Sequence, residues 1–591
     1  MSAPTRPTAP STNGRTPPTT DGATAPSTDG AAPAALDDVR AHLADWLAEA
    51  VLEAAPDLAA PLRDLGVDSL DLIRAARRIE TAYGVRVQLR ELFAEDMTAE
   101  HIARLVTERA GRRRTGADPL AVPGAAHGPV VLTPSQEQGW EEQTGSRAHW
   151  NQSLLFTTRP DLDPGVLAEA VRRLVAGHAS LRLTVEARPA KRPRQTVAAL
   201  TADTPLDAVL DTVDTRELDD CDLSEAVTLR CALEQRSLDP EAGRVARFVW
   251  FDAGPARPGR LLITVHQLAF DMVSWSILID DLERLYASLA AGDDGDDVRC
   301  TEGTGYPEWA QALAAHARTP EAEAESAWWT EVARTPGQVP LDRGPGGGGY
   351  GSGGGDGSGG GHLDPRAANT AATASTHVAQ FGPEFTGRLL EAARAHRCHP
   401  GELLLHALGE ALGAWQGLDA VRVEVLRHGR EETVGDTDLA RTTGWFTTTV
   451  PVRLDLAPGT PAERLARTVG HLAALPGGGV GHGALSRHGR PRISAALRGA
   501  PPSDVSFDFE GDDADGLPLG TLLLDIADEP VGEITGPDWV RPHLIEVIAT
   551  TDDGVLRVEW WYSTALHDQD TIARLAARHR DALAALVHPA G

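Results

Sequence analysis

The sequence predicts a multidomain protein in which a small helical domain precedes a large mixed α/β region. Residues 36–112 contain amphipathic segments whose apolar residues recur at helical spacing. From Val130 onward, short apolar runs alternate with helical patterns, and a Gly-rich stretch at 344–361 interrupts this region near its middle. A chain of 591 residues is also too long for one ordinary domain.

Composition limits the possible partners. The net charge is −30, with 85 acidic against 55 basic residues. Such a surface repels phosphate backbones and anionic lipids, so we expect neither nucleic-acid nor membrane binding. No apolar run is long enough to span a bilayer, and the N-terminus does not have the basic-then-apolar pattern of a leader. The sequence therefore favours a cytoplasmic protein.

The four cysteines are expected to be free structural thiols. Cys221, Cys231, Cys300 and Cys398 show no C-x-x-C spacing, which argues against a metal cluster or a disulfide framework.

Two polar segments flank the helical domain. Residues 1–35 are a Pro/Thr/Ser/Ala/Gly-rich tail that cannot bury enough apolar surface to offset the entropy of ordering, so we expect it to be disordered. Residues 113–128, rich in Pro, Gly and Ala, are expected to form an interdomain linker.

The helical domain is centred on one short motif, Leu65-Gly66-Val67-Asp68-Ser69-Leu70. A loop closes on Gly66, and Asp68 or Ser69 can cap the helix that follows. Flanking helices are expected from Val39 to Leu52, from Leu89 to Phe93 and from Thr98 to Val106. Ser69 thus brings a hydroxyl to a helix N-terminus, where the dipole favours a phosphate. The alternative is that Ser69 only caps the helix.

The large region is predicted to form two mixed α/β lobes. Strands are expected at Leu154–Phe156 and Leu261–Val265, and helices at Val166–Val175 and Ile277–Leu289. Residues 344–361 lack the Lys-Ser/Thr ending of a phosphate loop, so they are expected to be a flexible insertion. This insertion would separate lobes at 129–343 and 362–589.

A His–Asp segment lies between a predicted strand and a predicted helix. His266 ends the apolar strand, and Asp271 follows five residues later, just before the helix. This pair could be an acid/base site, or both residues could be structural.

The helical domain resembles the carrier-protein domains of nonribosomal peptide and polyketide assembly lines. The resemblance covers about residues 36–112 and is carried by the Leu65–Leu70 motif and the order of the helices. It implies a four-helix bundle in which a phosphopantetheinyl transferase attaches 4'-phosphopantetheine from coenzyme A to Ser69. The thiol of that arm would hold an acyl or aminoacyl group as a thioester.

Residues 129–589 resemble the condensation superfamily of nonribosomal peptide synthetases, with most similarity to its epimerisation branch. The resemblance implies a two-lobed α/β domain of chloramphenicol-acetyltransferase type with a tunnel between the lobes. It is carried, in chain order, by Leu132-Thr133-Pro134-Ser135-Gln136, His149-Trp150-Asn151-Gln152-Ser153, His178-Ala179-Ser180-Leu181-Arg182, Val265 to Trp275, His428-Gly429-Arg430-Glu431, Thr443-Gly444-Trp445-Phe446-Thr447, Gly481-His482-Gly483-Ala484-Leu485, Val505-Ser506-Phe507-Asp508 and Arg541-Pro542-His543-Leu544.

The sequence departs from this family at its reactive positions. The family motif is His-His-x-x-x-Asp-Gly with a catalytic second His, and that position holds Gln267. His266 matches the first His, and Asp271 matches the Asp, which in the family is mainly structural and pairs with an Arg; Arg430 fits that role.

Two further positions also bear on the epimerisation branch. Met272 replaces the motif Gly, but Val273-Ser274-Trp275 is still typical of that branch. Leu426 stands where the branch has its proton-transferring Glu. Losing one general acid/base typically costs about 10²–10⁴ in rate, so the loss of both disfavours epimerisation.

Two functions remain open. The first is amide bond formation or cyclisation of a carrier-bound thioester, in which Gln267 orients the amine by hydrogen bonding and His266, Ser274 or His428 could substitute for the missing base. The second is an inactive platform that presents the carrier-bound substrate to tailoring enzymes or other synthetase subunits. Because no adenylation region is recognisable, we expect a separate adenylation protein to load the carrier in trans.

Overall fold

The computed structural model describes residues 36–50, 56–65, 67, 69–85, 87, 89–92, 97–112, 127–143, 147–188, 192–199, 209–293, 300, 302–343, 365–430, 434–512, 517–552 and 554–587. They belong to two compact units, Met1–Ala121 and Val122–Gly591, which are described separately. The expected disordered tail, the Gly-rich insertion and almost all of the expected linker lie outside the described residues.

The first unit is a small helical bundle, as expected. Its helices are α1 (Leu36–Ala50), α2 (Ser69–Tyr83), the short α3 (Leu89–Leu92) and α4 (Ala99–Arg112). They surround a core that includes Leu43, Leu47, Leu72, Ala76, Ile79, Ile102 and Val106, all buried. Helix α4 continues beyond the expected end at Val106, and Arg109 in its last turns donates two hydrogen bonds to Glu91 of α3.

The first sheet of the second unit has the strand order β12-β2-β7-β6-β5. Its strands are β2 (Asn151–Thr158), β5 (Leu210–Asp214), β6 (Ala246–Asp252), β7 (Arg260–His266) and β12 (Leu523–Ile526). Helices α6 (Pro164–Gly177) and α8 (Met272–Ala290) bury one face of this sheet, and α7 (Asp220–Ser237) packs on the other. A separate small sheet pairs β1 (Gly128–Val130), β4 (Arg194–Val197) and β3 (Leu183–Glu186).

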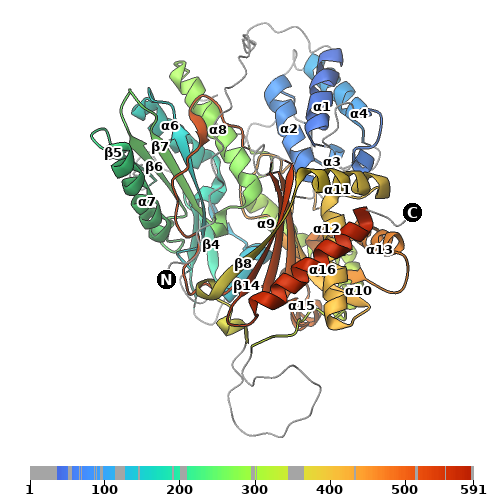
Figure 1. Ribbon diagram of the computed structural model, residues 1–591. Helices are drawn as coiled ribbons and strands as arrows, with labels where there is room; N and C mark the ends of the chain where they lie inside the picture. The colour runs from blue at the N-terminus through green and yellow to red at the C-terminus, as the bar shows by residue number, and fades with distance from the viewer. Residues whose placement is uncertain are drawn as a thin grey trace, which may run out of the picture. The chain divides into compact units, whose positions relative to one another are not determined.

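The second sheet has the order β10-β9-β11-β13-β14-β8. These strands are β8 (Ala374–Phe381), β9 (Ala420–Arg427), β10 (Thr448–Asp455), β11 (Val505–Asp512), β13 (Ile545–Asp552) and β14 (Val555–Ser563). Helices α11 (Pro383–His396), α12 (Pro400–Gln416) and α16 (Gln569–Val587) cover the face that carries Val423, Val547 and Trp560 (Figure 1). Arg422, Glu424 and Leu426 alternate along β9 with Val421 and Val423, which face these helices, so they lie on the opposite face.

The two cores do not divide the chain at the Gly-rich stretch as expected. Strand β12 comes from the later half of the sequence but pairs antiparallel with β2 in the first sheet. Helix α10 (Pro320–Ala333) comes from the earlier half but buries Ala322 and Trp329 in the core of the second sheet. Chain position therefore predicts the lobes only approximately, because these elements find their partners across the lobe boundary.

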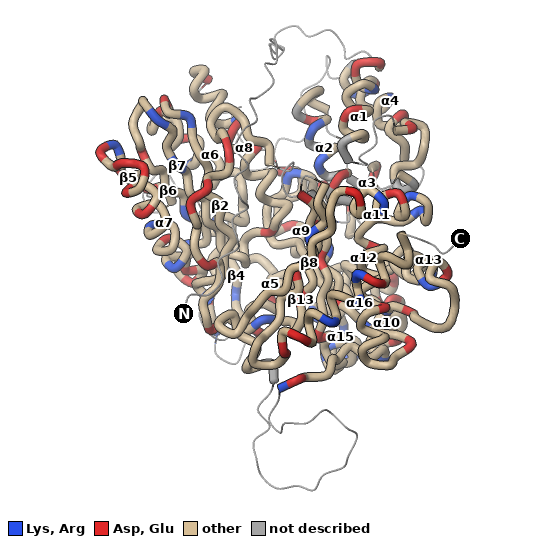
Figure 2. The backbone as a smooth tube through the Cα atoms, viewed as in Figure 1, with Lys and Arg blue, Asp and Glu red and all other residues tan. Residues whose placement is uncertain are grey.

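Charge is interspersed along the described chain. In the view of Figure 2, Lys and Arg alternate with Asp and Glu over most elements. None of the helices that the structure describes is long and apolar enough to cross a membrane.

Candidate functional site

The Asp271–Arg430 pair anchors the junction between the two lobes. Asp271 precedes α8 and caps it, accepting hydrogen bonds from the Ser274 amide at 3.0 Å and the Ser274 hydroxyl at 2.7 Å. Arg430 donates to both carboxylate oxygens, at 2.7 and 3.0 Å, and the Phe446 amide donates at 3.0 Å. All three side chains of Asp271, Ser274 and Arg430 are at most 1% exposed. The pairing expected from the sequence is present, and the Asp271 carboxylate is fully engaged by donors.

Ser274 is part of the same anchor. Its hydroxyl donates to Asp271 and accepts hydrogen bonds from the Gly444 amide and from Arg430, both at 3.1 Å. These contacts use the hydroxyl for structure, which favours a structural role for Ser274 over proton transfer.

His428 and Gly429 position Arg430. The Nδ1 atom of the buried His428 accepts a hydrogen bond from the Arg430 amide at 3.0 Å. Gly429 has φ +68°, and a Cβ atom there would lie 2.0 Å from the carbonyl oxygen of Phe446. Only glycine tolerates both conditions, so this turn holds the arginine where Asp271 can reach it.

His266 is a structural residue. It is 0% exposed, its Nδ1 accepts a hydrogen bond from the Leu268 amide at 3.1 Å, and its Nε2 donates to the Arg147 carbonyl at 2.7 Å. Burial lowers the pKa of His266 to about 4. Both ring nitrogens of a neutral imidazole are thus in use, which favours the structural role of His266 over substitution for the missing base.

Gln267 begins the short helical turn Gln267–Ala269 and is half-buried. Its Oε1 accepts a hydrogen bond from Gln152 Nε2 at 3.1 Å, and Gln152 Oε1 accepts one from the indole N–H of Trp275 at 2.8 Å. The sequence analysis quoted Gln152 only as part of a motif and gave it no role. Its position in β2, directly opposite Val265 of β7, brings it next to the motif loop.

Ionisable side chains lie near Leu426 on the face of the second sheet opposite α11, α12 and α16. Leu426 is half-buried, and Glu424 on the same face accepts a hydrogen bond from His543 Nε2 at 2.8 Å. Burial opposes both charges, but the pair itself lowers the pKa of Glu424 and raises that of His543. Sequence reasoning missed this pair because its members are 119 residues apart.

Asp508 is a second carboxylate on that face. Strands β11 and β9 are parallel, with Ser506 opposite Glu424 and Phe507 opposite Val425. The next residues along the two strands are Asp508 on β11 and Leu426 on β9. Leu426 is the residue that stands where the epimerisation branch has its Glu. Burial raises the pKa of Asp508 to about 6, so its carboxyl group can take up or release a proton near neutral pH.

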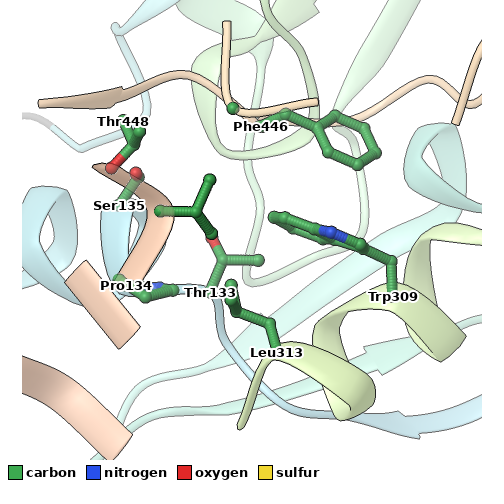
Figure 3. A pocket seen from close by; sticks show the side chains of 9 residues that line it. Thr133, Pro134, Ser135, Trp309, Leu313, Phe446 and Thr448 are labelled. Carbon is green, nitrogen blue, oxygen red and sulfur yellow. The ribbon is translucent and has the colours of Figure 1, made fainter. Parts of the chain in front are cut away.

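A small pocket is lined in part by Gly429, next to Arg430 in the chain, and by Phe446 (Figure 3). It is a space of about 250 Å³ that includes open solvent, and it is lined by Thr133, Pro134, Ser135, Trp309, Leu313, Gly429, Phe446, Thr448 and Val480. Its lining is mostly apolar and offers hydroxyl groups from Ser135 and Thr448. The Ser135 hydroxyl already donates to the Thr447 carbonyl at 2.7 Å, so the pocket contains no acid/base group.

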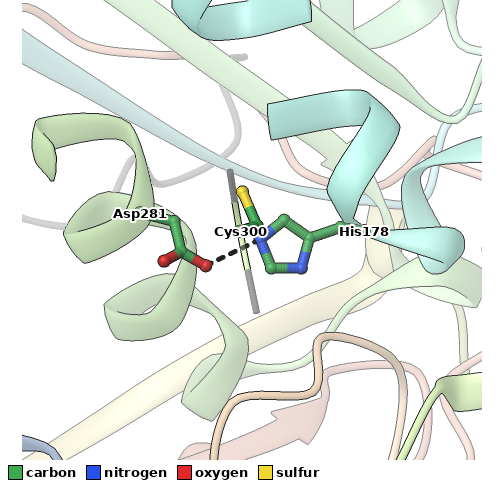
Figure 4. Close-up of side chains that lie close together, drawn as sticks. All are labelled: His178, Asp281 and Cys300. Atoms are coloured by element: carbon green, nitrogen blue, oxygen red, sulfur yellow. Dashed lines mark ion pairs between the residues drawn. The ribbon is translucent and has the colours of Figure 1, made fainter. Parts of the chain in front are cut away.

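A separate buried cluster joins His178, Asp281 and Cys300 (Figure 4). Their possible ligand atoms all lie within 4.8 Å of one another, and His178 Nε2 is 3.0 Å from Asp281 Oδ2. Arg441 also pairs with Asp281, and Glu302 lies 3.2 Å from His178 Nδ1. These ion pairs already neutralise the carboxylate, so we interpret the cluster as a structural charge network rather than a metal site.

The charge network raises the pKa of His178 and so favours its protonated form. Burial lowers the pKa of His178, but Cys300, Asp281 and Glu302 outweigh it and raise the pKa well above its usual value. For Asp281, burial alone would raise the pKa. The positive charges of Arg441 and His178 have the larger effect, so the pKa of Asp281 is lowered.

Ser69 lies in the first unit, apart from these residues in the sequence. It is the first residue of α2, a 15-residue helix, one position after the place that a capping residue normally occupies. Asp68 and Gly66 of the motif lie outside the described residues.

Comparisons with known proteins agree with both parts of this architecture. The family model for condensation domains matches residues 127–590, and the model for phosphopantetheine attachment sites matches residues 37–106. A carrier-type helical bundle thus precedes a two-lobed α/β domain, as in nonribosomal peptide synthetases. The chain belongs to the condensation-domain family, and 4'-phosphopantetheine is the covalent cofactor of its first domain.

Individual relatives support the same assignment. A linear gramicidin synthase protein of Brevibacillus parabrevis is 30% identical over 89% of this chain, and chondramide synthase cmdD of Chondromyces crocatus is 30% identical over 87%. The chain spans only 10% and 12% of those proteins. Among solved structures, the epimerization domain from the third module of tyrocidine synthetase B is 23% identical with a TM-score of 0.66, over 79% of this chain and 99% of that one. The X-domain from teicoplanin biosynthesis is 20% identical with a TM-score of 0.58, over 80% and 98%.

Proposed function

We propose that this chain carries an aminoacyl or peptidyl group as a thioester on Ser69 and that its condensation domain joins or cyclises that group by amide bond formation. Ser69 is the only serine between residues 36 and 112, and it opens a long helix whose dipole favours a phosphate. In the condensation domain, the observation that carries the proposal is the orientation of Gln267, which stands at the position of the family's catalytic His and whose Oε1 accepts a hydrogen bond from Gln152.

Positioning supplies the catalysis in this proposal. An aminoacyl thioester is already activated, so holding it next to an amine accelerates the reaction without a strong base. The motif loop offers no titratable group that is free to transfer a proton, because His266 and Asp271 are both engaged.

Loading of Ser69 is the first test. The chain is incubated with coenzyme A and a phosphopantetheinyl transferase, and its mass is measured. We expect the mass of one arm to be added to the wild type and to Thr107→Ala, a hydroxyl control in α4, but not to Ser69→Ala. An arm on Ser69→Ala would contradict the assignment.

Amide formation is tested with an acetyl group on the Ser69 arm and an aminoacyl-N-acetylcysteamine as soluble acceptor. We expect N-acetylated product from the wild type and none from Ser69→Ala. A large gain in Gln267→His would show that the site has lost activity relative to an active ancestor.

A catalytically inactive platform is the second candidate. The platform is favoured because His266, Asp271 and Ser274 are all held in structural hydrogen bonds. Gln267, which cannot transfer a proton, is the remaining polar side chain of the motif loop. The X-domain, which shares this fold, has been solved in a complex with OxyB. Absence of product in both the wild type and Gln267→His, with a partner protein still bound, would support the platform.

Epimerisation is the least favoured function. It needs one group to remove the α-proton and another to return it, whereas Gln267 and Leu426 supply neither. The chain is loaded with an L-alanyl thioester in heavy water, and deuterium at the α-carbon is measured by mass spectrometry. We expect no uptake above that of the isolated thioester. Uptake that disappears in Asp508→Asn would assign the proton transfer to Asp508 and overturn this ranking.

The proposed partners follow from the two domains. A phosphopantetheinyl transferase installs the arm, and other synthetase subunits or tailoring enzymes receive the carrier in the biosynthesis of a peptide natural product. The two matched regions occupy nearly all of this sequence, so the amino acid is loaded by a domain outside it, in our proposal a separate adenylation protein.

A further inference from the structure

Three side chains form a hydrogen-bonded series that runs from α8 through β2 to the motif loop. The Trp275 indole donates to Gln152 Oε1 at 2.8 Å, and Gln152 Nε2 donates to Gln267 Oε1 at 3.1 Å. An indole N–H can only donate, so the atom of Gln152 that faces it must be the oxygen. The amide group of Gln152 then presents its NH₂ to Gln267, and the atom of Gln267 that faces it must again be the oxygen.

The series determines which end of Gln267 remains for a ligand. Because Oε1 faces Gln152, the NH₂ group of Gln267 points away from it, and no acceptor among the described residues lies within hydrogen-bond distance of Nε2. The side chain is half-buried, and Trp275, which begins the series, is only 2% exposed. Gln267 therefore offers a donor whose orientation is held by a buried residue.

A fixed donor selects the chemistry of its ligand. A carbonyl oxygen accepts two hydrogen bonds and keeps its carbon electrophilic, and polarisation by a donor makes that carbon more so. An attacking amine is a poor ligand here, because an N–H donor would occupy the lone pair with which it attacks. The carbonyl oxygen of the thioester therefore suits this donor better than the attacking amine that the sequence analysis considered.

We propose that Gln267 holds the carbonyl oxygen of a thioester through its Nε2–H, and that Gln152 and Trp275 are positioning residues that keep this donor exposed. The inference rests on the proposed function for its substrate class, a carrier-borne thioester. It assigns Gln267 to the electrophile rather than to proton transfer.

An isosteric change in Gln152 is expected to reverse the orientation of the Gln267 amide. In Gln152→Glu, one carboxylate oxygen still accepts from Trp275, but the other oxygen can only accept, so the Gln267 amide turns over and presents Oε1 to the ligand. Gln267→Leu removes the donor, and Trp275→Phe releases the constraint on Gln152. Gln380→Glu, an exposed change on strand β8, is the matched control for the added charge.

The probe is S-acetyl-N-acetylcysteamine with carbon-13 in the thioester carbonyl, studied on the full chain by isotope-edited infrared spectroscopy and calorimetry. We expect the bound carbonyl band of the wild type and Gln380→Glu to move to lower frequency. Gln267→Leu should abolish this shift and weaken binding by about 3- to 10-fold, the worth of one neutral hydrogen bond. Gln152→Glu should weaken it at least as much, and Trp275→Phe should give an intermediate shift.

A thioether probe, S-ethyl-N-acetylcysteamine, lacks only the carbonyl oxygen and separates recognition of that oxygen from binding of the arm. We expect Gln267→Leu to leave its affinity unchanged. Equal carbonyl frequencies in the wild type, Gln267→Leu and Gln152→Glu would overturn the proposal, as would equal affinities of the wild type for the two probes. Thermal unfolding of each variant shows that it is folded. Loading of Ser69 is measured separately, so failure of this proposal is distinguishable from failure of the proposed function.

Discussion

Asp271 shows how a motif residue can be retained for structure while its neighbour changes chemistry. Its carboxylate caps α8, pairs with Arg430 and accepts from the Phe446 amide, so it joins segments that are 159 and 175 residues away in the chain. None of these contacts depends on the residue at position 267. The anchor can therefore persist whether or not the loop carries a catalytic His.

Replacing Asp271 should be strongly destabilising. Asp271→Ala leaves the Arg430 guanidinium buried without its counter-charge, which costs about 3–5 kcal/mol of unfolding free energy. The measurement is urea unfolding of the full chain. Asp161→Ala removes an exposed ion pair with Arg159 and should leave the midpoint unchanged. Similar midpoints for both variants would mean that the anchor carries little stability.

His178 should stabilise the protein in a pH-dependent way. Its pKa is raised in the folded state, so its contribution is fully present below the ordinary histidine pKa of about 6.5 and is lost as the pH rises through the raised value. We expect the difference in unfolding free energy between the wild type and His178→Gln to be largest near pH 6 and to shrink in alkali. A difference that grows with pH would show that His178 is neutral in the folded protein.

Among the elements, the start of strand β12 and the residues before it are hydrogen-bonded to a single carboxylate. Glu283 of α8 accepts hydrogen bonds from the amides of Gly520, Thr521, Leu522 and Leu523, at 2.7 to 3.2 Å. These bonds bring the segment before β12 onto α8, so the strand can pair with the edge of β2.

The Glu283→Gln variant should loosen this segment. A glutamine keeps one acceptor oxygen and turns an NH₂ toward the same amides, so some of them lose their partner. We expect amide hydrogen exchange of Gly520–Leu523 to accelerate about tenfold or more, since each lost charge-assisted bond is worth more than 1.4 kcal/mol. Glu308→Gln, an exposed change in α9 (Tyr306–His316), is the control and should leave this exchange unchanged. Unchanged exchange in Glu283→Gln would show that β12 is held by its strand pairing alone.

At the scale of the whole molecule, buried histidines should make the protein sensitive to acid. Burial lowers the pKa of several of them to about 4 in the folded state: His266, His406, His482, His488, His567 and His579. The unfolded chain binds protons at these sites below about pH 6.5, so stability falls as the pH drops from about 6.5 to 4.

This acid sensitivity is measured as the unfolding free energy across that pH range. His178 and His543 oppose the trend because their pKa values are raised, but the histidines with lowered pKa values are more numerous. A flat stability profile between pH 6.5 and 4 would contradict the neutral state of the buried histidines.

The sequence predicted the parts of the site that are local. The spacing from His266 to Asp271 placed one at a strand end and the other before a helix. Arg430, which is 159 residues away from Asp271, was expected as its partner only through the family resemblance. The roles of His266 and Gln152 could not be predicted from local spacing. His266 bonds to the Arg147 carbonyl and Gln152 to Trp275, and these groups meet only when β2 and β7 pair.

The sequence by itself determined the order of the two domains, the helical carrier motif around Ser69 and the substitutions at Gln267 and Leu426, because periodicity, turn chemistry and residue type are properties of short segments. Only the tertiary structure decided that β12 joins the first sheet, that β11, which carries Asp508, pairs with β9, which carries Leu426, and that Gln152 faces Oε1 of Gln267. Those outcomes depend on which distant groups meet once the sheets have formed, and hydrogen bonds then determine which atom of each side chain is left exposed.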